Sequence, residues 1–101
     1  MQESINKLST YFGFSIKSNA ILFGIDNIVK SRKPVELIVL CSSANEKTIR
    51  TVQNKGNKVI QLKNILLSDL VKRDNVKVVA IKNSNLAKAI LSFDDMFTEL
   101  N

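Results

Sequence analysis

Two nearly continuous apolar segments constrain the fold more than any other feature of this sequence. They are VELIVL (residues 35–40) and VKVVAI (residues 76–81), and both are rich in β-branched residues. Such segments are too apolar for a strand with one face in solvent, so they predict strands that are buried on both faces of a sheet. Shorter segments at residues 59–62 and 20–23 predict two further strands. The sequence therefore predicts a sheet of four strands.

The segments between these strands have the apolar periodicity of helices. Residues 43–56 begin with a capping box, Ser43 followed by Glu46, and reach Gly56, a natural helix stop. Apolar residues also recur every three or four positions in four other segments, which are residues 4–14, 25–30, 64–73 and 84–100. Each of these segments is predicted to form one helix.

Strict alternation of helices and strands predicts an α/β fold, a three-layer α/β/α sandwich in which helices cover both faces of the sheet. The length of 101 residues suits one domain. Residues 1–91 form its body. Residues 92–101 are predicted to be the acidic, amphipathic end of the C-terminal helix, with an apolar stripe of Phe93, Phe97 and Leu100. This stripe either docks on the domain or offers a helix to a protein partner.

The charge of the chain is unevenly distributed. The formal net charge is +6, but residues 92–101 contain Asp94, Asp95 and Glu99 and no basic residue. The remaining 91 residues therefore hold fifteen basic and six acidic side chains. A body this basic favours a polyanion such as a nucleic acid as partner, although lysines that only keep a small protein soluble give the same excess.

Residue types argue against several classes of function. The chain has no histidine, so the commonest general base and the commonest metal ligand are both missing. Its single cysteine, Cys41, follows a predicted strand and is expected in the core. We therefore expect no enzyme, metal, cofactor or small-molecule substrate. No apolar run approaches the ~20 residues that cross a bilayer, and the first residues lack the order of a signal peptide, so a cytoplasmic protein without a membrane partner is expected.

Aromatic residues of the first helix are a further candidate for stacking on bases. Tyr11, Phe12 and Phe14 lie close together in the sequence. Aromatic platforms for RNA usually lie on a sheet face, whereas these three residues fall in a predicted helix. Phe12 and Phe14 are therefore expected in the core, and Tyr11 at its rim.

The segment GIDNIVK (residues 24–30) combines buried and polar positions at helical spacing. Ile25, Ile28 and Val29 fall on one face, and the polar residues between them form an outward row. The simplest interpretation is a solvated face with a surface ion pair between Asp26 and Lys30, four residues apart. The alternative is that this row is presented to a ligand.

The same segment resembles a motif of the ribosomal protein L-seven-Ae/L-thirty-e superfamily, most closely in its bacterial YlxQ-type branch. The family motif Gly-x-Asn-Glu-x-x-Lys opens the second helix. Gly24 and Lys30 match it, while Asp26 and Asn27 stand where Asn and Glu are expected. The resemblance continues in ELIVLCSSANEKT (residues 36–48) and LSDLVKRDNVKVVAIKNSNLA, and it covers roughly residues 5–91.

This resemblance implies a mixed four-stranded sheet and a non-enzymatic, mostly monomeric RNA-binding protein of ribosomes or other ribonucleoproteins, often specific for kink-turns. It places Gly24, Asp26, Asn27 and Lys30 on the RNA, together with the loop before the last strand. In that loop the residues concerned are Arg73, Asn75 and Val76. Together with the charge pattern, it predicts phosphate contacts by a set of basic side chains. These are Lys17, Lys30, Arg32 and Lys33. The alternative is a protein-interaction domain of the same fold that has lost specific RNA recognition.

Overall fold

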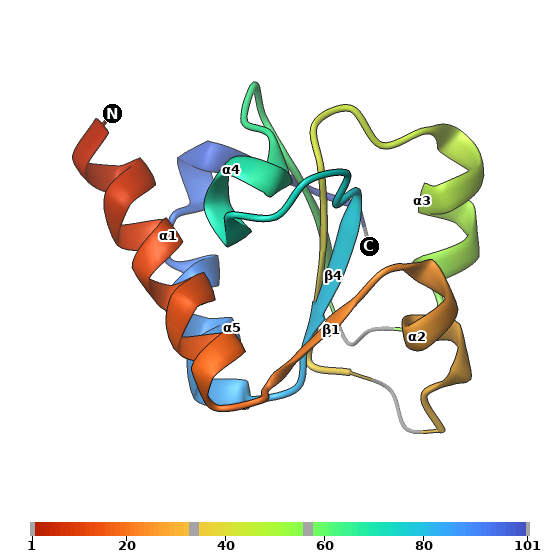
Figure 1. Ribbon diagram of the computed structural model, residues 1–101. Helices are drawn as coiled ribbons and strands as arrows, with labels where there is room; N and C mark the ends of the chain where they lie inside the picture. Colours follow the sequence, from red (N-terminus) through yellow and green to blue (C-terminus); the bar gives the residue numbers. More distant parts are fainter. Residues whose placement is uncertain (1, 33–34, 56–57, 101) are drawn as a thin grey trace.

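Helices and strands alternate along the chain in the computed structural model, which describes residues 2–32, 35–55 and 58–100 (Figure 1). The helices are α1 Gln2–Lys17, α2 Ile25–Lys30, α3 Glu46–Val52, α4 Leu67–Val71 and α5 Ser84–Leu91, with a 3-10 helix, η1, at Asp94–Met96. The strands are β1 Ile21–Phe23, β2 Leu37–Leu40, β3 Val59–Leu62, β4 Val78–Ile81 and β5 Phe97–Glu99. The predicted α/β alternation is confirmed.

The five strands form one mixed sheet in the order β1-β4-β2-β3-β5. Strands β2 and β3 are parallel, and β4 is antiparallel to both of its neighbours, β1 and β2. Strands β1, β2 and β3 consequently run in one direction and end at the same edge of the sheet. We call this the carboxyl edge, and the edge at which these three strands begin the opposite edge. Strand β4 starts at the carboxyl edge, between the ends of β1 and β2.

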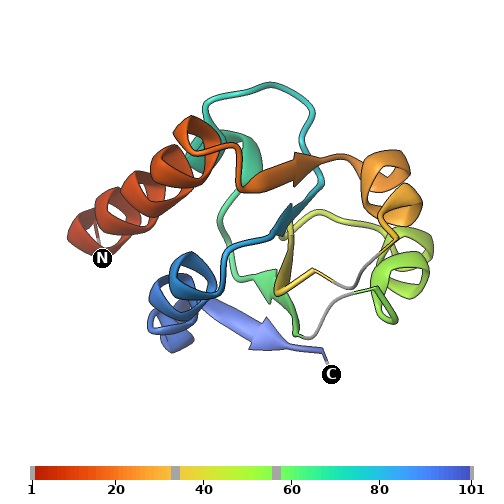
Figure 2. The same ribbon diagram turned by 90° about the horizontal axis from the view of Figure 1, so that it is seen from below.

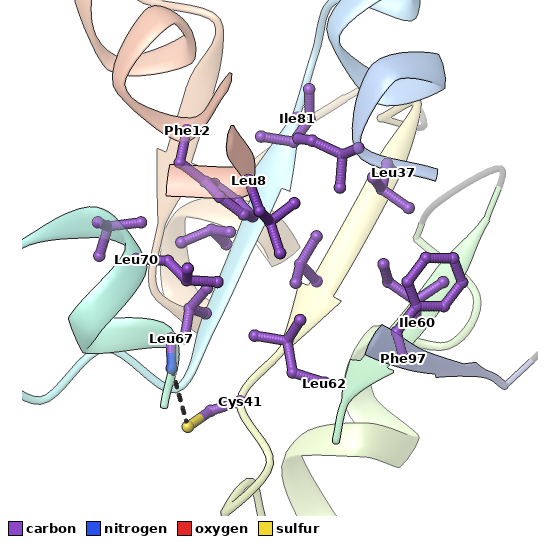
Figure 3. Packing of buried hydrophobic residues seen from close by; sticks show 14 of the residues in the cluster. Leu8, Phe12, Leu37, Cys41, Ile60, Leu62, Leu67, Leu70, Ile81 and Phe97 are labelled. Carbon is purple, nitrogen blue, oxygen red and sulfur yellow. Dashed lines mark hydrogen bonds between the residues drawn. The ribbon is translucent and has the colours of Figure 1, made fainter. Parts of the chain in front are cut away.

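Helices cover both faces of the sheet, as the alternation predicts. Helices α1, α4 and α5 pack on one face, and α2 and α3 on the other (Figures 1 and 2). On the first face, Leu8 and Phe12 of α1 and Leu70 of α4 lie in one buried cluster with side chains of β2, β3 and β4 (Figure 3). On the second face, Ile28 of α2 and Val52 of α3 lie in another. Two apolar cores therefore fix the helices on the sheet.

The predicted C-terminal helix is wrong beyond residue 91. Helix α5 ends at Leu91, η1 follows, and Phe97 begins a fifth strand that pairs with β3. The sheet therefore has five strands, where four were expected. The open edge of β3 explains the difference, because pairing there satisfies backbone groups and buries Phe97, which is only 5% exposed.

The residue after β5 is also held in place. The Leu100 N–H donates to the Val59 carbonyl at 2.9 Å, and its side chain packs against the second core. The Gln53 amide donates to the Leu100 carbonyl at 3.4 Å. The end of the described chain is thus built into the sheet, and it presents no amphipathic helix to a partner.

Several local predictions also need correction. The two long apolar segments begin as strands only at Leu37 and Val78. Helix α3 is capped by Asn45 instead of Ser43, because the Asn45 side chain accepts a hydrogen bond from the Thr48 N–H at 2.8 Å. That helix ends at Val52, and the predicted stop at residue 56 lies outside the described residues.

Two apolar residues expected in the core face solvent. Phe14 is 51% exposed on α1, and Val29 is 41% exposed on α2. Helix α2 has only six residues and buries one side chain completely, Ile28. Ile25 is half-buried against the second core, so the predicted apolar face is narrower than the periodicity indicated. In the described part of the chain, no helix is long and apolar enough to cross a membrane.

Candidate functional site

A groove of about 370 Å³ lies at the carboxyl edge of the sheet. Three parts of the chain form its walls: the turn from β1 into α2, the first turns of α3, and the segment that leads into β4 (Figure 1). The lining residues are Phe23, Gly24, Ile25, Thr48, Asn75, Val76, Lys77 and Val78. In open α/β sheets ligands usually bind at the carboxyl ends of the strands, at a topological switch point of the sheet.

Gly24 sets the turn that opens one wall. Its φ of 84° and ψ of 155° belong to a backbone region that residues with a side chain rarely adopt. Its N–H donates to the Val78 carbonyl at 3.1 Å, which ties the turn to the start of β4. A Cβ at this position would meet no atom within 4 Å, so backbone conformation, not lack of space, favours glycine here. This turn places α2 beside the groove.

The opposite wall is the loop between α4 and β4, and Ser68 holds it in shape. The Ser68 hydroxyl accepts a hydrogen bond from the Val76 N–H at 3.0 Å, and the Ser68 carbonyl accepts from the Arg73 N–H at 3.2 Å. Lys72 and Asn75 both have φ of 59°, in the left-handed region. Two left-handed residues and the hydrogen bonds to Ser68 define the course of this loop.

Arg73 connects the two walls. Its guanidinium carbon lies 4.0 Å from the centroid of the Phe23 ring, the geometry of a cation–π contact. Phe23 is the last residue of β1 and lines the groove. The contact fixes the position of the Arg73 charge beside the groove while leaving the side chain exposed.

Lys77 supplies a second cation, which is held from outside the groove. Its Nζ donates to the Ser43 hydroxyl at 2.8 Å, and the Ser43 oxygen lies 3.3 Å from Cys41 Sγ. The sulfur in turn accepts from the Leu67 N–H at 3.4 Å (Figure 3). Cys41 is buried, as predicted.

These contacts also change the acidity of the thiol. Burial alone would raise the pKa of Cys41. The hydrogen bond with the Ser43 side chain, the N–H groups of Ser43 and Leu67, and the charge of Lys77 together outweigh burial and lower that pKa below its usual value. The thiol is therefore electrostatically linked to the wall of the groove.

Asp26 and Asn27 lie on the first turn of α2, next to the groove but not in its lining. Both are exposed. The Asn27 side-chain amide donates to the Phe23 carbonyl at 2.7 Å, so one of its donors is engaged within the protein. The predicted ion pair between Asp26 and Lys30 is not formed, since the ion pairs among the described residues involve other side chains.

The other predicted cations are not part of the groove. Lys30 and Arg32 lie at or beyond the far end of α2, which is about 9 Å long at the rise of an α-helix. Lys17 ends α1, before β1 begins, and so lies at the opposite edge. Lys33 lies outside the described residues. Of the predicted site residues, the groove brings together Gly24, Asn75 and Val76, with Arg73 on its Phe23 wall.

Sequence reasoning missed five lining residues of the groove: Phe23, Ile25, Thr48, Lys77 and Val78. Lys77 was assigned to the interior of a strand, but the strand begins one residue later and leaves Lys77 in the approach to it. Thr48 is an ordinary helix residue, and only the packing of α3 beside α2 directs it to the groove. Neither residue carries a local pattern that identifies it.

The groove offers binding groups. Its lining includes the apolar residues Phe23, Ile25, Val76 and Val78 and the polar residues Thr48, Asn75 and Lys77. These groups can contact an aromatic ring, donate hydrogen bonds and neutralise an anion. Among the described residues, no three His, Cys, Asp or Glu side chains are grouped as metal ligands would be.

No protein-family model, curated protein or solved structure matches this chain.

Proposed function

We propose that this chain is a non-enzymatic RNA-binding protein, associated with a ribosome or another ribonucleoprotein, that receives structured RNA at the groove of the carboxyl edge. The observation that carries this proposal is a recess with one cation, Lys77, in its lining and a second cation, Arg73, held on a lining residue. Arg73 is stacked on Phe23, and Lys77 is bonded to Ser43. The net charge of +6 gives the rest of the surface a general attraction for phosphates.

The resemblance to the L-seven-Ae/L-thirty-e superfamily supports the same surface. In that family the start of the second helix and the loop before the last strand meet RNA, often at a kink-turn. Here the corresponding segments supply Gly24 on one side of the groove and Asn75 and Val76 on the other. The likeness thus points to two segments, about fifty residues apart in sequence, that line one recess.

In the proposed mechanism the cations position the RNA and the recess selects its structure. Arg73 and Lys77 meet phosphates on two sides of the groove, which gives affinity that falls as salt rises. An unstacked base enters between them and lies on the apolar surface. The carboxylate of Asp26, which lies at the rim, accepts a hydrogen bond from a base amino group. A carboxylate pairs only with donors, whereas an amide at the same place would pair with donors and with acceptors.

The alternative function, a protein-interaction domain, loses one of its two supports. It depended on Asp26 and Asn27, which depart from the family motif, and on an acidic amphipathic helix in residues 92–101. Residues 97–99 form a strand of the sheet instead of a helix.

Fluorescence anisotropy with a kink-turn RNA and a plain duplex, each at two salt concentrations, tests the proposal. We expect tighter binding of the kink-turn that persists at the higher salt. Reversing the charge of both cations, Arg73→Glu with Lys77→Glu, should lower the affinity about 100-fold. The slope of log K against log salt should also fall by the amount that corresponds to about two phosphate contacts.

The matched control reverses two cations at the opposite edge, Lys17→Glu with Lys82→Glu. This pair makes the same change in net charge, so it isolates position from total charge. We expect a loss of no more than about fivefold, through the general field of the protein. Equal losses in the two double variants would refute the groove as the binding site. Absence of binding to either RNA at low salt would refute RNA binding itself.

A further inference from the structure

Ser43 lies outside the groove, yet its side chain contacts Lys77, a lining residue of the groove. It belongs to the turn between β2 and α3, and its hydroxyl oxygen lies 2.8 Å from Lys77 Nζ. The backbone makes a second link between the same two segments, since the Cys41 N–H donates to the Lys77 carbonyl at 2.8 Å. Both the main chain and the side chain of Lys77 are therefore tied to this turn.

The direction of each hydrogen bond follows from the chemistry of the groups. An ammonium has only donors, so the Ser43 oxygen must accept from Lys77. The one hydroxyl hydrogen of Ser43 is then available for the sulfur of Cys41, 3.3 Å away. The sulfur is fixed in turn, because it is buried and accepts from the Leu67 N–H at the start of α4. A chain of bonds thus runs from the core to the Lys77 ammonium.

This chain limits the freedom of a side chain that would otherwise be mobile. A lysine has four rotatable side-chain bonds, and ordering them on binding costs entropy. A hydroxyl anchored on the core removes part of that cost before the ligand arrives, which is the usual gain from preorganisation. The anchor leaves the ammonium two further donors for a phosphate.

We infer that Ser43 is a positioning residue that holds the Lys77 ammonium at the wall of the groove, ready to contact an RNA phosphate. This inference rests on the proposed function and adds to it a residue that does not touch the RNA. Ser43 acts through Lys77, so its contribution exists only while Lys77 keeps its charge.

RNA binding by anisotropy in a double-mutant cycle tests this coupling. Ser43→Ala should weaken binding about fivefold and Lys77→Met about tenfold, while the double variant should be no weaker than Lys77→Met alone, because interacting residues are not additive. Ser43→Thr keeps a hydroxyl and should restore binding to within about twofold of the unmodified protein. Ser42→Ala removes the neighbouring hydroxyl, which has no contact with Lys77, and should have no effect.

A second measurement needs no RNA. Side-chain ¹⁵N relaxation of Lys77 Nζ in the free protein should show higher mobility in Ser43→Ala and recovery in Ser43→Thr. Unchanged Lys77 mobility, or independent effects of Ser43→Ala and Lys77→Met on affinity, would overturn the inference while RNA binding stands. If the unmodified protein binds no RNA, the proposed function fails. A Ser43-dependent Lys77 mobility would then still establish the positioning of the ammonium.

Discussion

The two edges of the sheet both carry cations, but they hold them in different ways. At the carboxyl edge Arg73 lies on an aromatic ring and Lys77 is bonded to a serine that contacts the core. At the opposite edge Lys58 pairs with Glu99 at 3.2 Å, but Lys17 and Lys82 are exposed, and no side-chain contact within the described residues fixes either of these two charges. The comparison teaches that the number of charges does not locate a site on a basic protein. The proposed site is therefore placed at the recess that fixed charges border.

Two glycines differ in the backbone conformation that they adopt, and substituting them should give the largest effect. Gly24, in the turn beside the groove, has a positive φ, whereas Gly13 lies inside helix α1. Gly24→Ala should lower the free energy of unfolding by about 1–3 kcal/mol, because alanine is strained at a φ of 84° and a ψ of 155°. Urea denaturation measures this loss. Gly13→Ala in α1 is the matched control, and it should raise the free energy of unfolding by about 0.5–1 kcal/mol, since alanine favours a helix interior. A Gly24→Ala variant as stable as the unmodified protein would show that this turn tolerates a side chain.

Ser68 tests how firmly the loop between α4 and β4 is held. Ser68→Ala leaves the half-buried Val76 N–H without its acceptor, and the expected loss of stability is about 1 kcal/mol. Hydrogen exchange at the Val76 amide should accelerate in the same variant. Ser18→Ala is the corresponding change near the opposite edge, where the hydroxyl donates to the Phe14 carbonyl of the preceding helix, and it should cost less than about 0.5 kcal/mol. Equal effects at the two serines would contradict the contrast between the edges.

The smallest expected effect is a pH dependence that comes from Cys41. Its thiol has a lowered pKa in the folded chain, so in the window between that pKa and the usual value of 9.0 the unfolded chain binds more protons. Stability should therefore rise with pH across this window, and the gain should be absent below it. Urea denaturation at several pH values, compared with Cys41→Ala, isolates this contribution. The slope should also diminish in Ser43→Ala, which lacks a hydrogen bond that lowers the pKa. An identical pH dependence of all three proteins would exclude the link between the thiol and the groove.

The sequence allowed the alternation of helices and strands to be predicted because apolar periodicity is a local property. The prediction of a helix failed at residues 92–100 for a physical reason. The spacing of Phe93, Phe97 and Leu100 suits a helix, but the open edge of β3 is a tertiary feature, and it draws residues 97–99 into a strand. Local spacing carries no information about which strand edge remains unpaired.

The candidate site was predicted only in part, for a related reason. Gly24 has a recognisable motif, and its turn does border the groove. Thr48 and Lys77 reach the same recess from segments that are distant in sequence, and their local surroundings look like those of any exposed polar residue. The predicted cations Lys17, Lys30 and Arg32 were chosen for charge and proximity in sequence, whereas the fold directs them elsewhere.

The place of β4 in the sheet has a consequence for how the protein folds. Strand β1 pairs only with β4, so residues 21–23 have no strand partner until residues 79–81 arrive nearly sixty positions later. Contacts of such long range slow folding relative to local ones. Both walls of the groove flank β4, so the recess exists only once this long-range pairing has formed. Ligand binding there would then draw the chain toward its native state by mass action and would report directly on the folded population.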